Sequence, residues 1–326
     1  MKRKEIAGMG CLALTALIWG LAFVSQVQGM DSMSPLFFNA TRFTLGALSL
    51  IPLLVAVRLR GRRVETGERR RDASGGEMRT LLLGDGVKVT LPAWASNSVA
   101  VGVLCGLVLF SASTAQQYGV LYSRSAGRSG FITALYIVMV PLIAFVVLRR
   151  RIHSNVVLSV VLAVIGFYLL CVTDGFGSIT MADLVLLASA VLFAAHILVI
   201  DTFGKKLDAL TISFFQTLTT AVLSWIGALA EGSVDWAGAG HAWVAVVYAG
   251  VGSVGIAYTL QVVGQRYVPP TRGAMLMSLE SFFSALGGAI ILGEVMTARG
   301  YFGCVLIFAG TMLAQLPIEA LKRHRP

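Results

Sequence analysis

Ten apolar segments, each close to the length of a membrane-spanning helix, alternate with short polar stretches along the chain. A helix of about 20 residues crosses the hydrocarbon core of a bilayer. The pattern therefore predicts an all-α polytopic membrane protein with about ten transmembrane helices. The apolar segments fall at residues 8–28, 35–57, 97–122, 127–148, 155–173, 181–201, 210–231, 241–265, 270–292 and 299–317.

The segments of the first half recur in the second half. The fourth segment aligns without a gap to the ninth, so that Arg128 falls on Arg272 and Tyr136 on Glu280, 144 residues further on. The first two segments align instead to the sixth and seventh, at a separation of 174 residues. The step between the two separations indicates a 30-residue insertion between the second and third segments, where the chain is strongly basic.

The alignment predicts two repeats of five helices each. We expect the first repeat at 1–173, with the insertion at about 58–95, the second at 181–317, and a tail at 318–326. Because the number of helices in each repeat is odd, the second repeat enters the membrane upside down. Inverted repeats are typical of secondary transporters, whose substrate site lies near the midplane between the two halves.

Composition and charge agree with a membrane location. Of the 326 residues, 56% are hydrophobic and 13% charged, and the mean hydropathy is +0.80. A water-soluble domain could not bury so much apolar surface. The net charge of +10 could indicate nucleic-acid binding, but all 26 Lys and Arg except four lie on one side if the N-terminus is cytoplasmic. This asymmetry predicts a bacterial cytoplasmic (inner) membrane protein with both termini in the cytoplasm, and a basic loop that faces anionic lipid rather than nucleic acid.

Motifs for catalysis or cofactor binding are missing from the sequence. It contains no H-E-x-x-H, no G-x-x-x-x-G-K-[ST], no G-x-S-x-G and no C-x-x-C. The four histidines are too scattered to predict a metal cluster. We therefore expect no catalytic residues, no cofactor and no metal, and we exclude an ATP-driven pump within this chain. A small-molecule substrate, with or without protons, is the expected partner.

Glu280 is the most informative residue, because it lies near the middle of the ninth apolar segment. A charged side chain in hydrocarbon is costly and usually faces a cavity or a partner. Two interpretations stay open: a structural hydrogen bond, or a cavity-lining, proton-linked role. Its neighbours Ser281, Ser284, Gly287 and Gly288 are small, which favours close packing inside the bundle.

Other polar and aromatic residues within the spans are candidates for the same cavity: Gln261, Gln117, Tyr136, Trp19, His196 and Arg42. Each has a structural alternative. The two glutamines, which hold matching places in the repeats, could join helices instead of contacting a ligand. Arg42 could snorkel to the outer interface, and Trp19 and Tyr136 could be core aromatics. His196 could be an internally satisfied histidine or a proton relay.

Three stretches resemble EamA-type transporters of the drug/metabolite transporter superfamily: AGRSGFITALYIVMVPL (126–142), FAAHILVID (193–201), and residues 259–310. The most specific features are S-L-E in the ninth span, a later G-E, and G-x-x-L-I-x-x-G in the tenth. Two features depart from the family pattern: Ser281 stands where a proline is usual, and Arg149-Arg150 replaces G-E in the first repeat.

The resemblance implies ten helices, cytoplasmic termini and a central cavity lined mainly by helices 1, 3, 4, 6, 8 and 9. Helices 5 and 10 are then peripheral and available for a homodimer. We expect a secondary transporter that exports small metabolites, amino acids or drug-like compounds by alternating access. Two other classes remain as alternatives. A membrane-embedded enzyme would need clustered carboxylates or a metal at a membrane face, and a scaffold or sensor would leave Glu280 unexplained.

Overall fold

The computed structural model describes residues 3–65, 80–83, 87–90, 96–149, 154–171, 179–204, 207–268, 276–277 and 279–314. Within them, seven helices are long and apolar enough to cross a membrane, and three shorter apolar helices complete the set. The long spans are Arg3–Gly29, Pro35–Val57, Ser98–Ser123, Ala126–Val147, Met181–Gly204, Ala209–Ala230 and Trp243–Gln265; the shorter ones are Val157–Cys171, Leu279–Ile291 and Ala298–Leu313. Each corresponds to one of the ten predicted segments.

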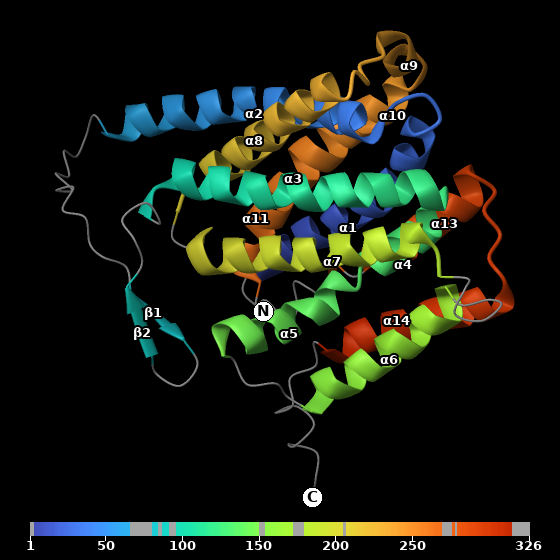
Figure 1. The fold of residues 1–326 in the computed structure, drawn as a ribbon. Coiled ribbons are helices and arrows are strands. Elements are labelled where there is room, and N and C mark those ends of the chain that lie inside the picture. Colours follow the sequence, from blue (N-terminus) through green and yellow to red (C-terminus); the bar gives the residue numbers. More distant parts are fainter. Residues whose placement is uncertain are drawn as a thin grey trace, which may run out of the picture.

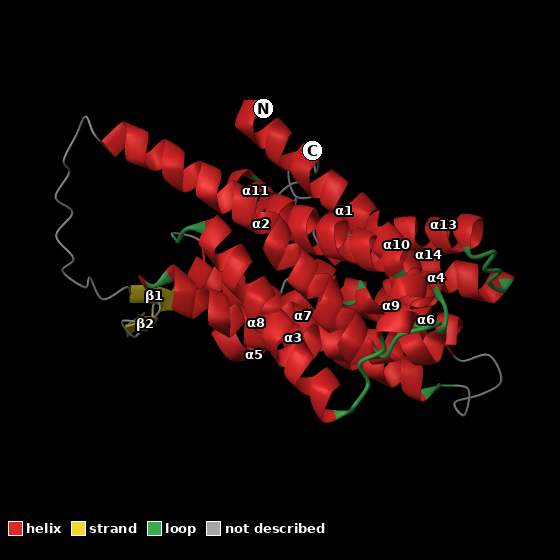
Figure 2. Cartoon of the chain, turned by 90° about the horizontal axis from the view of Figure 1, so that it is seen from above, coloured by secondary structure: helices red, strands yellow, loops and turns green. Residues whose placement is uncertain are grey.

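The helices form one bundle (Figures 1 and 2). The first repeat contains α1 (Arg3–Gly29), α2 (Pro35–Glu65), α3 (Ser98–Ser123), α4 (Ala126–Thr133), α5 (Tyr136–Leu148) and α6 (Ser154–Cys171). The second contains α7 (Met181–Val199), η3 (Ile200–Gly204), α8 (Ala209–Ala230), α9 (Trp236–His241), α10 (Trp243–Val247), η4 (Tyr248–Ala257), α11 (Tyr258–Tyr267), α13 (Leu279–Ile291) and α14 (Ala298–Ala314).

Polar side chains define where several of these helices begin. Asn97 caps α3 by accepting hydrogen bonds from the backbone nitrogens of Val99 and Ala100, and Asp208 caps α8 through Thr211. Such caps satisfy backbone donors that have no partner in the first turn. They set the helix boundaries that the apolar pattern alone leaves imprecise.

Two spans depart from a regular α-helix. The fourth is divided at Ala134–Leu135 into α4 and α5. Pro141 inside α5 has no N–H to donate to the carbonyl of Ile137, which weakens the turn that follows this break. In the eighth span, η4 is a π-helix, a form that is often found at functional sites. Both irregular regions lie beside the central cavity described below.

Helix packing follows a pseudo-two-fold relation between the repeats. The pairs α2–α8, α4–α13 and α6–α14 each join equivalent helices, and α6 and α14 lie side by side in Figure 1. A β-carbon on Gly106 of α3 would lie 2.7 Å from the carbonyl oxygen of Gln216. One on Gly250, its repeat equivalent, would lie 2.9 Å from that of Arg42, the repeat equivalent of Gln216. The close helix crossings therefore recur in both halves, as two inverted five-helix repeats require.

The basic insertion differs in part from the expected loop. Helix α2 continues into the first residues of the insertion and ends at Glu65. Two short strands, β1 (Thr80–Leu83) and β2 (Val87–Thr90), then pair antiparallel from Thr80 opposite Thr90 to Leu83 opposite Val87. The all-α prediction is confirmed for the membrane spans, and this hairpin is an addition to it.

Candidate functional site

A cavity lies at the centre of the bundle, between the two repeats. Six of the seven candidate residues line it: Glu280, Gln261, Tyr136, Trp19, His196 and Arg42. They come from α13, α11, α5, α1, α7 and α2 respectively. The helices that the family resemblance implies therefore line the cavity. Helix α2, which that resemblance did not include, lines it as well.

Glu280 is bound by its own repeat equivalent. Its side chain is 4% exposed, and the hydroxyl of Tyr136, 5% exposed, donates a hydrogen bond to Oε2 at 3.2 Å. The break between α4 and α5 makes Tyr136 the first residue of α5. Among the described residues, no cation lies within ion-pair distance of the Glu280 carboxylate. In the described part of the chain, the Tyr136 hydroxyl is therefore the one donor to this carboxylate, which otherwise faces the cavity.

Small residues on α13 explain how Glu280 reaches the centre. One face of the helix buries Glu280 with Ser281, Ser284, Gly287 and Gly288, while apolar side chains such as Ile290 cover the opposite, exposed face. Gly20 of α1 fits against this buried face, because a β-carbon there would lie 2.7 Å from the Glu280 carbonyl oxygen. The face with the small residues therefore packs inside the bundle, as predicted, whereas the opposite face of the helix is exposed.

Arg42 is buried in the cavity wall. The side chain is 3% exposed, and its guanidinium carbon lies 5.5 Å from the ring centre of Phe38 and 5.0 Å from that of Phe43. In the described part of the chain it forms no ion pair, and its Nε has no hydrogen-bond partner. The Arg42 side chain therefore does not snorkel to the outer interface.

His196 and Trp19 have defined partners beside the cavity. His196 Nε2 lies 3.1 Å from Gln216 Oε1, and the histidine side chain is 2% exposed. Trp19 donates from Nε1 to the carbonyl of Ser253 in η4 at 3.2 Å. Its ring meets that of Tyr258 edge to face, with centres 4.9 Å apart. These contacts join α7 to α8 and α1 to the eighth span.

The two repeat-matched glutamines are placed differently. Gln261 lines the cavity. Gln117 does not: it is fully buried, and its amide donates to the backbone carbonyl of Gln26 at 3.4 Å. Its neighbour Gln116 faces the cavity instead, together with Gln26 and Tyr258, which are not among the seven candidates from the sequence. The adjacent Gln116–Gln117 pair was the available signal, but only the helix orientation decides which of the two faces inward.

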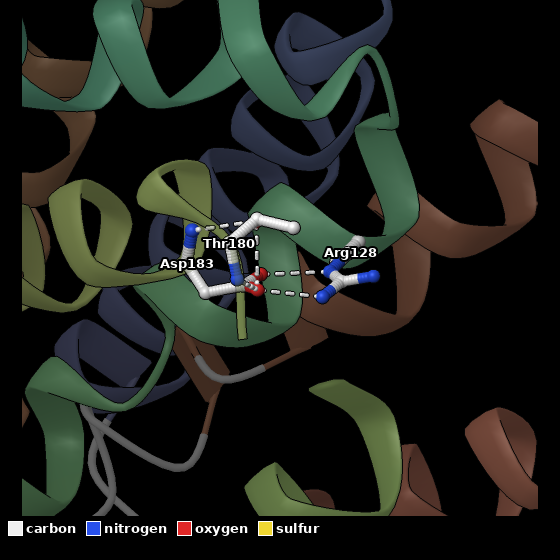
Figure 3. A network of polar contacts seen from close by, with 3 residues as sticks. All are labelled: Arg128, Thr180 and Asp183. Carbon is white, nitrogen blue, oxygen red and sulfur yellow. Dashed lines mark hydrogen bonds and ion pairs between the residues drawn. The ribbon is translucent and has the colours of Figure 1, made fainter. Parts of the chain in front are cut away.

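Polar contacts tie the start of α4 to the second repeat. Figure 3 shows Arg128 Nε and Nη2 on the two carboxylate oxygens of Asp183, at 2.8 and 2.6 Å. The same carboxylate accepts from Thr180 in a capping box at the start of α7. Glu294 accepts from the hydroxyl of Ser125, at 2.8 Å, and from the first backbone nitrogens of α4. Contacts of this kind cannot be predicted from the repeat alignment, because they join positions that are not equivalent in the two repeats.

Comparisons with known proteins agree with this architecture. An uncharacterized transporter from Archaeoglobus fulgidus is 27% identical over 316 residues, which cover 97% of this chain and 88% of the relative. A crystal structure that is 19% identical matches with a TM-score of 0.63 over 96% of this chain and 98% of its own, and shows the fold alone. Residues 6–70 and 180–316, more than half of the chain, match the EamA-like transporter family. This multi-pass membrane protein therefore belongs to the EamA-like transporter family, within the drug/metabolite transporter superfamily.

Proposed function

We propose that this chain is a secondary transporter that exports small metabolites by alternating access and couples their movement to protons at Glu280. Family membership supports transport, and the inverted repeats favour a mechanism in which two halves move around a midplane site. The observation that carries the proposal is the buried Glu280 carboxylate in the cavity, with Tyr136 as its hydrogen-bond partner.

The environment of Glu280 suits a group that gains and loses a proton. An ionised carboxylate buried without a cation is costly, and the Tyr136 hydroxyl offsets only part of this cost. Opening the cavity to water would stabilise the charged form, and closing it would favour the protonated one. The side to which the cavity opens and the protonation of Glu280 would thus depend on each other.

The size of the cavity supports a conformational cycle. The centres of water molecules can occupy about 50 Å³ of it, which is enough for a few waters at about 10–15 Å³ each. A metabolite needs more room, so the walls must separate for it to enter.

The basic-residue asymmetry would put the start of α4 at the outer surface of a bacterial cytoplasmic membrane, with both chain termini in the cytoplasm. In that orientation the Arg128–Asp183 pair and the Glu294 contacts hold the outer end of the bundle closed. Export would then require these contacts to break and reform in each cycle.

Flux through proteoliposomes tests the proposal. Purified full-length protein, screened with amino acids, nucleobases and cationic dyes, should move at least one of these classes faster than protein-free liposomes. An imposed pH gradient should raise the accumulation of that compound. Flux without any response to the pH gradient would contradict the proton coupling, and absence of flux for every class would contradict transport.

A further inference from the structure

Among the described residues that line the cavity, the Arg42 guanidinium is the one strong cation. Burying such a group is costly unless an anion or a full set of hydrogen-bond acceptors balances it. Within the part of the chain that the structure describes, Arg42 has neither: its contacts are the rings of Phe38 and Phe43, and its Nε is unpaired. Ring faces hold a guanidinium in place but leave its N–H edge free to donate.

The repeat relation shows what the second half has at the same place. The equivalent of Arg42, 174 residues further on, is Gln216, whose side-chain oxygen is paired with His196. The equivalent of His196 in the first repeat is Ala22, which lines the same cavity as Arg42. In the second repeat, His196 therefore pairs with Gln216. In the first repeat, Ala22 offers only a methyl group at the equivalent position, so Arg42 is left facing the cavity.

Glu280 does not neutralise Arg42. The two side chains line the same cavity but are not within the 4.0 Å that defines an ion pair. The phenol of Tyr258 lines the same cavity. The guanidinium of Arg42 and the carboxylate of Glu280 are therefore separate groups in this cavity, and the guanidinium N–H groups are left for an acceptor that enters from outside the chain.

We infer that Arg42 binds an anionic oxygen group, a carboxylate or a phosphate, on the transported compound, so that the substrates are small organic anions. The inference rests on the proposed transport function, because the anion must reach a cavity at the centre of the bundle. A guanidinium suits this role because its planar fork donates two parallel hydrogen bonds to either group.

Binding to the full-length, detergent-purified protein tests the inference without requiring flux. Thermal unfolding is followed with succinate and with glycerol 3-phosphate, each at matched ionic strength against its uncharged analogue, succinamide or glycerol. A ligand that binds only the folded protein raises the melting temperature. We expect one anion or both to raise it and the uncharged analogues to leave it unchanged; the responding arm tells carboxylate from phosphate.

Variants assign the effect to Arg42. Arg42→Gln should weaken the apparent affinity for the anion about tenfold or more, while Arg42→Lys, which keeps the charge without the fork, should weaken it less. Arg124→Gln removes an arginine of the exposed pair with Asp31 and should bind like wild type. A structural role for Arg42 would instead lower the melting temperature of the free protein and leave the shift caused by the anion unchanged.

The outcomes separate this inference from the proposed function. If neither anion raises the melting temperature, or if Arg42→Gln responds as wild type does, the anion site is wrong even where neutral or cationic compounds are transported. If an anion binds through Arg42 but no compound crosses proteoliposomes, the anion site stands and the transport proposal fails.

Discussion

The hydroxyl of Tyr136 lies 3.2 Å from Oε2 of Glu280, and these two residues hold the same position in the two repeats. Equivalent residues of an inverted pair can touch only where the pseudo-two-fold axis passes. The contact therefore marks that axis, at the point where α5 and α13 approach the central cavity. The repeats are alike in backbone but differ in chemistry here, since one supplies a phenol and the other a carboxylate.

Replacing the carboxylate tests its role in coupling. Glu280→Gln keeps size and hydrogen bonding but cannot titrate, so we expect a normally folded protein that exchanges substrate downhill and no longer accumulates it under a pH gradient. Tyr136→Phe removes the donor but keeps the carboxylate, so accumulation should persist with a changed pH dependence. Both are measured by flux in proteoliposomes. Unchanged pH-driven accumulation in Glu280→Gln would end the coupling proposal.

Much of the fold could be predicted because membrane spans and repeats leave direct signals in sequence. Apolar runs of spanning length predicted all ten helices, and the 144-residue separation placed Tyr136 opposite Glu280 before any contact was known. The apolar runs depend only on hydrophobicity, and the repeat alignment depends only on similarity between the halves. Neither requires knowledge of side-chain orientation.

Side-chain orientation is what the sequence could not supply. Gln117 matches Gln261 in the alignment, yet Gln116 is the one that faces the cavity, because a shift of one residue turns a helical side chain by about 100°. Likewise Arg42 lies toward the outer part of its span in sequence, where snorkelling is common, but it is buried beside the rings of Phe38 and Phe43 of its own helix. Both rings belong to the buried core, so the direction of this face depends on how α2 packs against the other helices.

The close crossing of α6 and α14 predicts a loss of stability on adding one methyl group. A β-carbon on Gly166 would lie 2.6 Å from the carbonyl oxygen of Gly303 and 2.8 Å from the backbone nitrogen of Ile307. Backbone atoms cannot rotate away, so Gly166→Ala should lower the free energy of unfolding by about 1–3 kcal/mol. Gly10→Ala is the matched control, because nothing lies within 4 Å of that β-carbon. The melting temperatures of the two variants are compared by thermal unfolding in detergent. Equal melting temperatures would contradict the close contact between α6 and α14.

The ion pair at the start of α4 should matter more than a similar pair at the surface. Asp183 is fully buried, whereas the side chains of Arg124 and Asp31 are 49% and 69% exposed. Removing one partner of a buried pair leaves a costly unpaired group, so Asp183→Asn should destabilise the protein by about 2 kcal/mol, reduced from the fully buried case because Arg128 is partly exposed. Arg124→Gln should cost less than about 1 kcal/mol. A larger loss for Arg124→Gln than for Asp183→Asn would reverse this ranking.

The insertion offers a test of the repeat boundaries. The second repeat manages without its 30 extra residues, and lengthening or shortening a connection costs little free energy. Because α2 extends to Glu65, a deletion should begin after it: removing residues 66–77 should leave folding and flux near wild type. It keeps Arg58, Arg60, Arg62 and Arg63 in the last turns of α2, so the orientation should be unaffected. Loss of folded protein would show that the segment is a structural part of the first repeat.

Orientation can be measured with reporter fusions. The distribution of Lys and Arg predicts that the insertion and both termini lie on the cytoplasmic side, because a cytoplasmic excess of basic residues is the main determinant of topology. A fusion at Gly76 and one after Pro326 should therefore report the cytoplasm. Gly232 is a better outer position than Gly238, because it is exposed in a turn, whereas a β-carbon on Gly238 would collide with the carbonyl of Ser32. A fusion at Gly232 should report the periplasm. A periplasmic signal at Gly76 would invert the assignment, and the contacts of Arg128 and Glu294 would then close the cytoplasmic side instead.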